Sequence, residues 1–130
     1  MASYCTRSDV EGLYGSRNVA VWADLNNDQD ATIQAAAIAR AIETASELID
    51  SKLRNTVYSI PMRDHNGSTP VLIREIAATL AGVALFTARG GSMTRDEETG
   101  AAVHRYSARE LWAETVLEEL RLGRRVIEAC

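Results

Sequence analysis

The stretch that most constrains the fold is residues 70–88, because its side chains are apolar on nearly every side of a helix. Between Ile76 and Phe86 the only polar side chain is Thr79. A helix that is hydrophobic all round is buried on most sides, and this run of 11 residues is too short to cross a bilayer. We therefore expect 70–88 to be the central helix of a small helical domain, with its alanines and Gly82 letting neighbouring helices approach closely.

The composition favours helix over sheet. Of the 130 residues, 46% are hydrophobic and 25% are charged, which is typical of a globular domain. Alanine is abundant, whereas proline and aromatic residues are scarce. We predict an all-α fold, a small bundle in one domain spanning 1–130. Its expected helices are approximately 6–14, 31–57, 70–88 and 104–122, joined by long loops and followed by a C-terminal tail, 124–130.

Local signals support the first two of these helices. Thr6 and Asp9 have the spacing of a capping box, and Gly15 is suited to end the first helix. The segment 31–57 repeats apolar residues at steps of three and four, which traces one face of a long helix. That expected buried face consists of Ile38, Ile42, Ala45, Ile49 and Leu53.

Two segments are expected to connect helices without being helical. In 16–30 the apolar residues Val19, Val21, Trp22 and Leu25 should lie against the core. The segment 89–101 is rich in glycine and charge and has no apolar periodicity. We therefore expect it to be a loop that is mobile in the free monomer.

The last helix has its own start signal and its own apolar side. Ser107 and Glu110 again have capping-box spacing, so the helix begins at Ser107 or extends from further upstream. Gly123 is suited to end it. The side expected to be buried carries Leu111, Trp112, Thr115, Val116, Leu120 and Leu122.

One motif suggests a metal site. Asp24, Asn26, Asp28 and Asp30 offer oxygen ligands at alternate positions, as at the start of a calcium loop. The glycine and the bidentate glutamate that such a loop also needs are replaced by Gln29 and Ala35. The alternative is a solvated acidic segment in which Asp28 or Asp30 caps the following helix, and this is the interpretation that we favour.

No residue set in the sequence predicts catalysis. The two histidines, His65 and His104, both fall in expected loops, and Cys5 has no base near it in the sequence. Cys5 and Cys130 are too few for a disulfide framework or a zinc site, and we interpret them as reduced thiols of a cytoplasmic product. We expect neither an enzyme nor a cofactor, because an active site needs a convergent polar set.

The charge argues against one class of function. The net charge is −4 and the pI is near 5.2, whereas a module that grips nucleic acid through its phosphates needs a basic face. The same charge is compatible with a surface that DNA slides past, since the lumen of a DNA channel should not be adhesive.

Several short motifs together resemble a known family. They run from the N-terminus through the long helix to the start of the central helix, and they are Tyr4-Cys5-Thr6 with Asp9-Val10 and Tyr14-Gly15, Ala45 with Ile49-Asp50 and Leu53, Tyr58 with Ile60-Pro61, and Pro70 with Ile73-Arg74. In these motifs the chain resembles the small head-to-tail connector, or head-completion adaptor, proteins of Mu-like phages and prophages.

The resemblance implies a structural virion protein without a catalytic site. Such adaptors form a ring, commonly twelve-fold, that docks on the portal protein, extends the DNA channel and offers a platform for the next tail-side connector protein. The implied place is the neck of the virion, assembled in the host cytoplasm, with double-stranded DNA passing through unbound and no membrane partner. Within this hypothesis we expect the contact with the portal to involve Arg121, Arg124, Arg125, Val126 and Ile127.

Two alternatives remain open from the sequence. One is a stopper or head-completion ring one layer further from the head. The other is a cytoplasmic helical adaptor or regulator that is not part of the virion.

Overall fold

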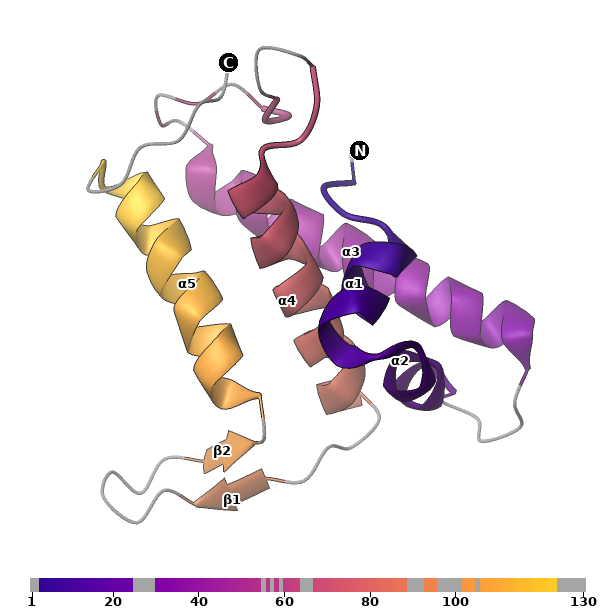
Figure 1. Ribbon diagram of the computed structural model, residues 1–130. Helices are drawn as coiled ribbons and strands as arrows, with labels where there is room; N and C mark the ends of the chain where they lie inside the picture. Colours follow the sequence, from indigo (N-terminus) through magenta and orange to yellow (C-terminus); the bar gives the residue numbers. More distant parts are fainter. Residues whose placement is uncertain are drawn as a thin grey trace.

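Helix α4, Val71–Ala88, is the centre of the bundle (Figure 1). This computed structural model describes residues 3–24, 30–54, 56, 58, 60–63, 67–88, 93–95, 102–104 and 106–123. Within them α4 contacts all four other helices, which are α1 (Arg7–Tyr14), α2 (Ser16–Ala23), α3 (Ala31–Leu53) and α5 (Ser107–Arg121). The prediction of an all-α bundle around 70–88 is therefore confirmed.

Helix α4 meets the length and hydropathy criterion of a membrane span, and it also packs as a core helix does. By length and composition alone its 18 residues, with a mean hydropathy of 1.7, are long and apolar enough to cross a membrane. The shorter run counted from the sequence therefore understated the apolar length of this helix. Core helices meet the same criterion, and α4 is in contact with helices on several sides.

The N-terminal helices are joined by a single glycine. The Thr6 Oγ1 atom accepts from the backbone N–H of Asp9, and the Thr6 N–H donates to Asp9 Oδ2 at 2.8 Å, so the predicted capping box is present. Gly15 ends α1 with φ of 90°, a conformation that glycine adopts without steric cost. The chain then turns directly into α2.

Helix α2 was not expected, since 16–30 was predicted to be a connector without helix. Its N-cap is Gly15, which offers no side-chain hydrogen bond, so the usual start signal is absent. Burial of Val19 and Trp22 against the bundle stabilises this short helix instead. Val21, which was also expected to lie against the core, is 50% exposed, and Leu25 lies outside the described residues.

Helix α3 follows the prediction except at its end. The Asp30 carboxylate accepts from Thr32 N–H at 2.9 Å, which confirms it as the cap. The predicted apolar face from Ile38 to Leu53 is buried throughout. The helix ends at Leu53 rather than near 57, because Arg54 has an extended conformation with ψ of 138°. The Leu53 carbonyl accepts instead from Thr56, from its hydroxyl at 2.6 Å and from its N–H at 3.3 Å.

The segment between α4 and α5 contains two short strands, which corrects the prediction of a loop over 89–101. Strands β1 (Met93–Arg95) and β2 (Ala102–His104) pair antiparallel, with Thr94 opposite Val103. Three residues per strand are too few for a periodicity to be visible in the sequence. Residues 102–104, where the last helix was expected to begin, form strand β2, and α5 therefore begins at Ser107.

The predicted capping box of α5 is also wrong. The N-cap residue is Tyr106 and makes no side-chain cap, so Ser107 is already the first helical residue. At the other end Gly123, with φ of 76°, follows the helix as predicted.

An aromatic cluster joins four helices at one end of the bundle. The rings of Tyr14, Trp22, Phe86 and Tyr106 meet edge to face, with centroids 5.0–5.5 Å apart. The Tyr14 hydroxyl also donates to the Thr79 carbonyl of α4 at 2.8 Å. Tyr14 packs directly on α4 at the one position of that helix without a side chain, Gly82.

Candidate interaction surface

The outward side of α5 carries large apolar side chains that the described structure leaves uncovered. Leu111 is 64% exposed, Trp112 43% and Leu122 46%. We call these three residues the α5 outer face. They make up half of the six large hydrophobic residues that are exposed in the described chain. Leu111 and Trp112 are neighbours near the start of α5, and Leu122 is the residue that follows its last turn. Contiguous exposed apolar surface is what marks interaction sites.

The α5 outer face corrects the sequence prediction, which placed these three residues and Thr115 on the buried side. The side chains that pack on the core are instead Ala113, Val116, Leu117 and Leu120. Those four follow the spacing i, i+3, i+4 and i+7, which is a single helix face, whereas Leu111 and Leu122 lie on the opposite side. The small Ala113 lets α5 approach the core closely. The sequence prediction left out Ala113 and Leu117, whose spacing with Val116 and Leu120 would have indicated the buried face.

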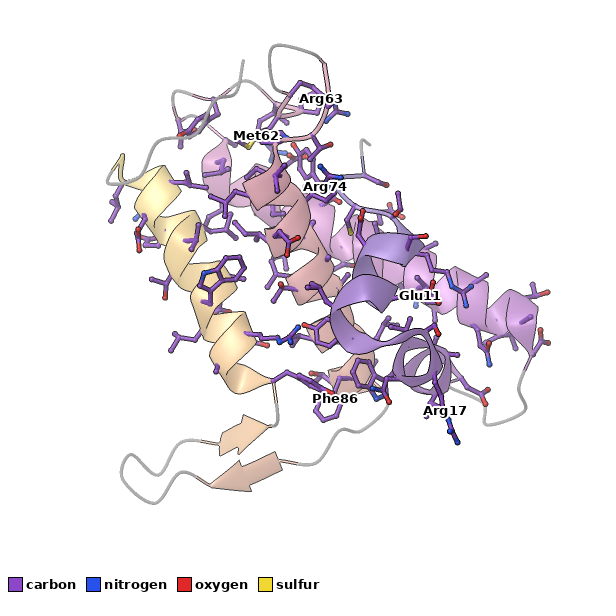
Figure 2. All side chains as sticks on the ribbon, viewed as in Figure 1. Glu11, Arg17, Met62, Arg63, Arg74 and Phe86 are labelled. Atoms are coloured by element: carbon purple, nitrogen blue, oxygen red, sulfur yellow. The ribbon has the colours of Figure 1, made fainter. Side chains whose placement is uncertain are left out.

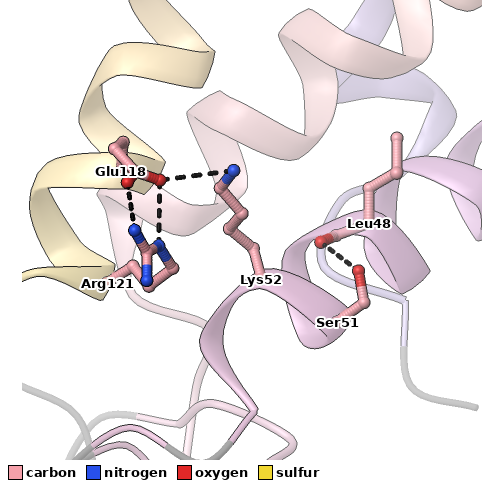
Figure 3. A network of polar contacts seen from close by, with 5 residues as sticks. All are labelled: Leu48, Ser51, Lys52, Glu118 and Arg121. Atoms are coloured by element: carbon pink, nitrogen blue, oxygen red, sulfur yellow. Dashed lines mark hydrogen bonds and ion pairs between the residues drawn. The ribbon is translucent and has the colours of Figure 1, made fainter.

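A network of charges anchors the end of α5 to α3, as Figure 3 shows. Lys52 of α3 lies 3.3 Å from the Glu118 carboxylate. The Arg121 guanidinium binds the same carboxylate with two nitrogens, Nε at 3.0 Å and Nη2 closer still. Hydrogen bonds from Arg121 and then from Lys52 lower the pKa of Glu118 to about 2.

Arg121 is the one predicted portal-contact residue that lies within the described chain. Its side chain is exposed, and its pKa is raised by the hydrogen bond to Glu118. The bidentate contact fixes the direction of the guanidinium. The other predicted contact residues, Arg124, Arg125, Val126 and Ile127, lie outside the described residues.

A second apolar surface is a groove between α3 and α4, with a volume of about 470 Å³. Its floor and walls are mostly alanine, and Arg40 lies at its edge. We call it the α3–α4 groove, and it is lined by Ile33, Ala36, Ala37, Arg40, Ala41, Thr44, Ala84, Leu85 and Ala88.

The third surface is a hollow of about 500 Å³ with many polar side chains, where the N-terminal segment meets the start of α4. Arg63 and Arg74 both line it, and Figure 2 labels both at this end of the bundle. Arg63 donates to the carbonyl of Met62 at 2.8 Å. Asp9 also lines the hollow, so its charge is mixed rather than uniformly basic.

Tyr4 holds the N-terminal segment beside this hollow. Its N–H donates to Ser46 Oγ at 3.1 Å, and its hydroxyl donates to the Asp50 carboxylate while accepting from the Met62 N–H at 2.9 Å. Burial, followed by the hydrogen bond to Asp50, raises the pKa of Tyr4 to about 12. Burial likewise raises the pKa of the adjacent Cys5 thiol to about 12.

The residues of the calcium alternative are only partly described. Asp24 is buried at the end of α2 and Asp30 caps α3. Asn26 and Asp28 lie outside the described residues, as do His65 and Cys130. Among the residues that the structure describes, no three His, Cys, Asp or Glu side chains are grouped as metal ligands.

Comparison with known families decides where the chain belongs. The family described as "Bacteriophage Mu, Gp36" matches residues 4–128, which is nearly the whole chain. The chain belongs to the Bacteriophage Mu Gp36 family. No curated protein matches it.

Membership of the Mu Gp36 family confirms the resemblance to Mu-like phage proteins. The family suggests a role in the structure or morphogenesis of a phage particle, and a virion-associated location is consistent with it. The match includes Tyr4 and the whole of α5 and the α3–α4 groove, so all three surfaces described above belong to the family region.

Proposed function

We propose that this chain is a head-tail connector of the adaptor type, a structural subunit of a ring that docks on the portal. The observation that carries the proposal is the match to a phage Mu family across residues 4–128. In this role the ring extends the DNA channel and forms the platform on which the tail attaches. The protein acts by binding and not by catalysis, and its place is the neck of the virion.

The surfaces of the fold support such a role. A subunit held between a portal, two ring neighbours and a tail-side protein needs several contact faces, and the described chain has apolar surface both on the α5 outer face and in the α3–α4 groove. The net charge of −4 is compatible with DNA passing through without being held.

The proposed portal contact is made by the end of α5 and the residues after it. Arg121 is exposed and oriented by Glu118, so it can make a charge-assisted hydrogen bond to an acidic group of the portal. Arg124, Arg125, Val126 and Ile127 continue the same segment with two charges and two apolar side chains.

The proposal is tested by electron microscopy of the purified protein mixed with the portal of its own phage. We expect a second ring stacked on the tail-side face of the portal. A variant lacking 124–130 should leave the portal bare, and Arg121→Ala should reduce its occupancy. Arg17→Ala is the matched control, because Arg17 is an exposed arginine on α2, away from α5 in Figure 2.

Other outcomes point to the alternatives. If the protein is abundant in tailed particles while the portal alone stays bare, it is a stopper or head-completion ring one layer further down. Absence from purified particles would refute the virion role and favour a cytoplasmic helical adaptor or regulator. Unchanged binding by the variant lacking 124–130 would refute the proposed portal contact.

A further inference from the structure

We propose that copies of this chain associate head to tail, with the α5 outer face of one copy seated in the α3–α4 groove of the next. This inference rests on the proposed function in one respect, since it names the ring neighbour as the partner of these surfaces. The two surfaces themselves are properties of the single chain and do not depend on that role.

The two surfaces are complementary in shape and polarity. The α5 outer face offers three bulky apolar side chains, and tryptophan, the residue at position 112, is among the residue types enriched at the energetic centres of interfaces. The α3–α4 groove has small side chains on both of its helices, from Ala36 and Ala37 to Ala84 and Ala88. A hollow with walls of alanine can receive bulky side chains that a wall of larger residues would exclude.

One residue of each surface carries a charge opposite to that of the other. Arg40 lies at the edge of the α3–α4 groove, and no residue in the described part of the chain forms an ion pair with it. Glu114 is exposed three residues after Leu111, which places it beside the α5 outer face, and it too has no ion-pair partner among the described residues. Glu43 and Glu47 lie beside Arg40 in an adjoining hollow, so it is the single pair of Arg40 with Glu114, and not a uniformly basic edge, that fixes the register of such a contact.

The positions of the two surfaces exclude contact between them within one copy. In Figure 1, α5 forms the left edge of the bundle, and the N-terminal half of α3, which carries Ile33 to Thr44, extends to the right edge. Because α5 packs on the core through Ala113 and Leu117, its outer face points away from its own groove.

Contact between two different surfaces generates a particular kind of assembly. An isologous dimer pairs one surface with itself, whereas a heterologous contact repeats from copy to copy and yields a closed ring or an open filament. Head-to-tail association through the α5 outer face and the α3–α4 groove is therefore the geometry that a ring subunit requires.

The first test is photocrosslinking from the α5 outer face. Trp112 is replaced by benzoylphenylalanine, and the full-length protein is irradiated alone at high concentration, on portals and within tailed particles. We expect crosslinks between copies to peptides that contain Ile33 to Ala41 or Ala84 to Ala88. The control places the same probe at Val71, which is 66% exposed on α4 but lies outside both surfaces, and should give no crosslinks to these peptides.

The second test is charge reversal. Arg40→Glu and Glu114→Arg each place like charges at the contact, and each should lower the association constant about tenfold. The double variant restores an opposite-charge pair at every contact and should recover the association of the wild-type protein. Arg17→Glu changes the net charge by the same amount as Arg40→Glu and should have no effect.

The outcomes separate this inference from the proposed function. Crosslinks from position 112 to the portal only, or to no protein in any of the three samples, would overturn the inference while leaving portal docking to its own test. Failure of the double variant to recover would contradict the pairing of Arg40 with Glu114. Conversely, crosslinks between copies in a protein that never binds portals would uphold the inference and refute the adaptor role.

Discussion

Among the glycines that the structure describes, Gly82 is the one where an added methyl group would meet the closest atoms. A Cβ atom built on Gly82 would lie 2.0 Å from Cε2 of Tyr14 and 2.4 Å from its Cδ2. Carbon atoms pack at roughly 3.5–4.0 Å, so in Gly82→Ala the ring has to move by about 1.5 Å. The ring is held in place by the bond from its hydroxyl to Thr79 and by edge contacts with Trp22 and Tyr106.

The expected cost follows from these contacts. Overpacking a close-packed core costs roughly 1–3 kcal/mol, and losing the Tyr14 hydrogen bond adds about 1 kcal/mol. Alanine in place of glycine in a helix returns roughly 1 kcal/mol. We therefore expect Gly82→Ala to lower the free energy of unfolding by about 1–3 kcal/mol, which corresponds to a fall in Tm of roughly 4 °C per kcal/mol for a chain of this size.

The assay is urea and thermal unfolding followed by far-ultraviolet circular dichroism, with a matched control. Gly12→Ala makes the same change in α1, where no atom lies within 4 Å of the added Cβ, and should stabilise the protein by roughly 0.5–1 kcal/mol. In a Tyr14→Ala background the clash is absent, so Gly82→Ala should there become neutral or stabilising. A Gly82→Ala protein as stable as the wild type, or equal effects in both backgrounds, would refute the reasoning.

Three further predictions concern the rest of the fold. Leu117→Ala should destabilise the protein by about 2–4 kcal/mol because the side chain is buried, whereas Trp112→Ala should cost about 1 kcal/mol or less; the reverse order in urea unfolding would contradict the assigned faces of α5. Tyr4→Phe should cost about 1–3 kcal/mol because Asp50 loses its buried donor. Since the pKa of Tyr4 is raised to about 12 in the folded chain, its contribution should be present below pH 10 and be lost as the pH rises through 12, and unfolding curves of Tyr4→Phe should depend less on pH across that window. The pKa of Glu118 is lowered, so its contribution to the free energy of unfolding should be present above the ordinary pKa of glutamate and be lost as the pH falls toward 2. Glu118→Gln should remove this acid dependence. High salt should weaken it, because the ion pairs of Glu118 with Arg121 and Lys52 are exposed.

Features set by neighbours in the sequence could be predicted well. The capping box of Thr6 and Asp9, the cap at Asp30 and the turn at Gly15 each involve residues within one helical turn of each other. The buried face of α3 was equally clear, because its apolar side chains repeat at the helical period over several turns.

Features set by distant parts of the chain could not be predicted in this way. Helix α2 has no capping signal and owes its stability to the burial of Val19 and Trp22. The prediction of the buried side of α5 was partly wrong, because apolar residues occur on both sides of that helix. Its true core face includes the small Ala113. When the buried face of a helix is predicted from its large apolar residues, an alanine such as Ala113 is ignored. A close contact between two helices nevertheless depends on such a small side chain.

The sequence by itself determined the helical class, the central helix and the family, because composition, period and short motifs are local properties of the chain. Only the tertiary structure decided which apolar residues are left over for partners. Trp112 is an apolar residue in the sequence whether it faces the core or the solvent, and packing of α5 through Leu117 is what turns it outward. Exposure is a property of the whole fold, since it depends on every element that could cover a side chain.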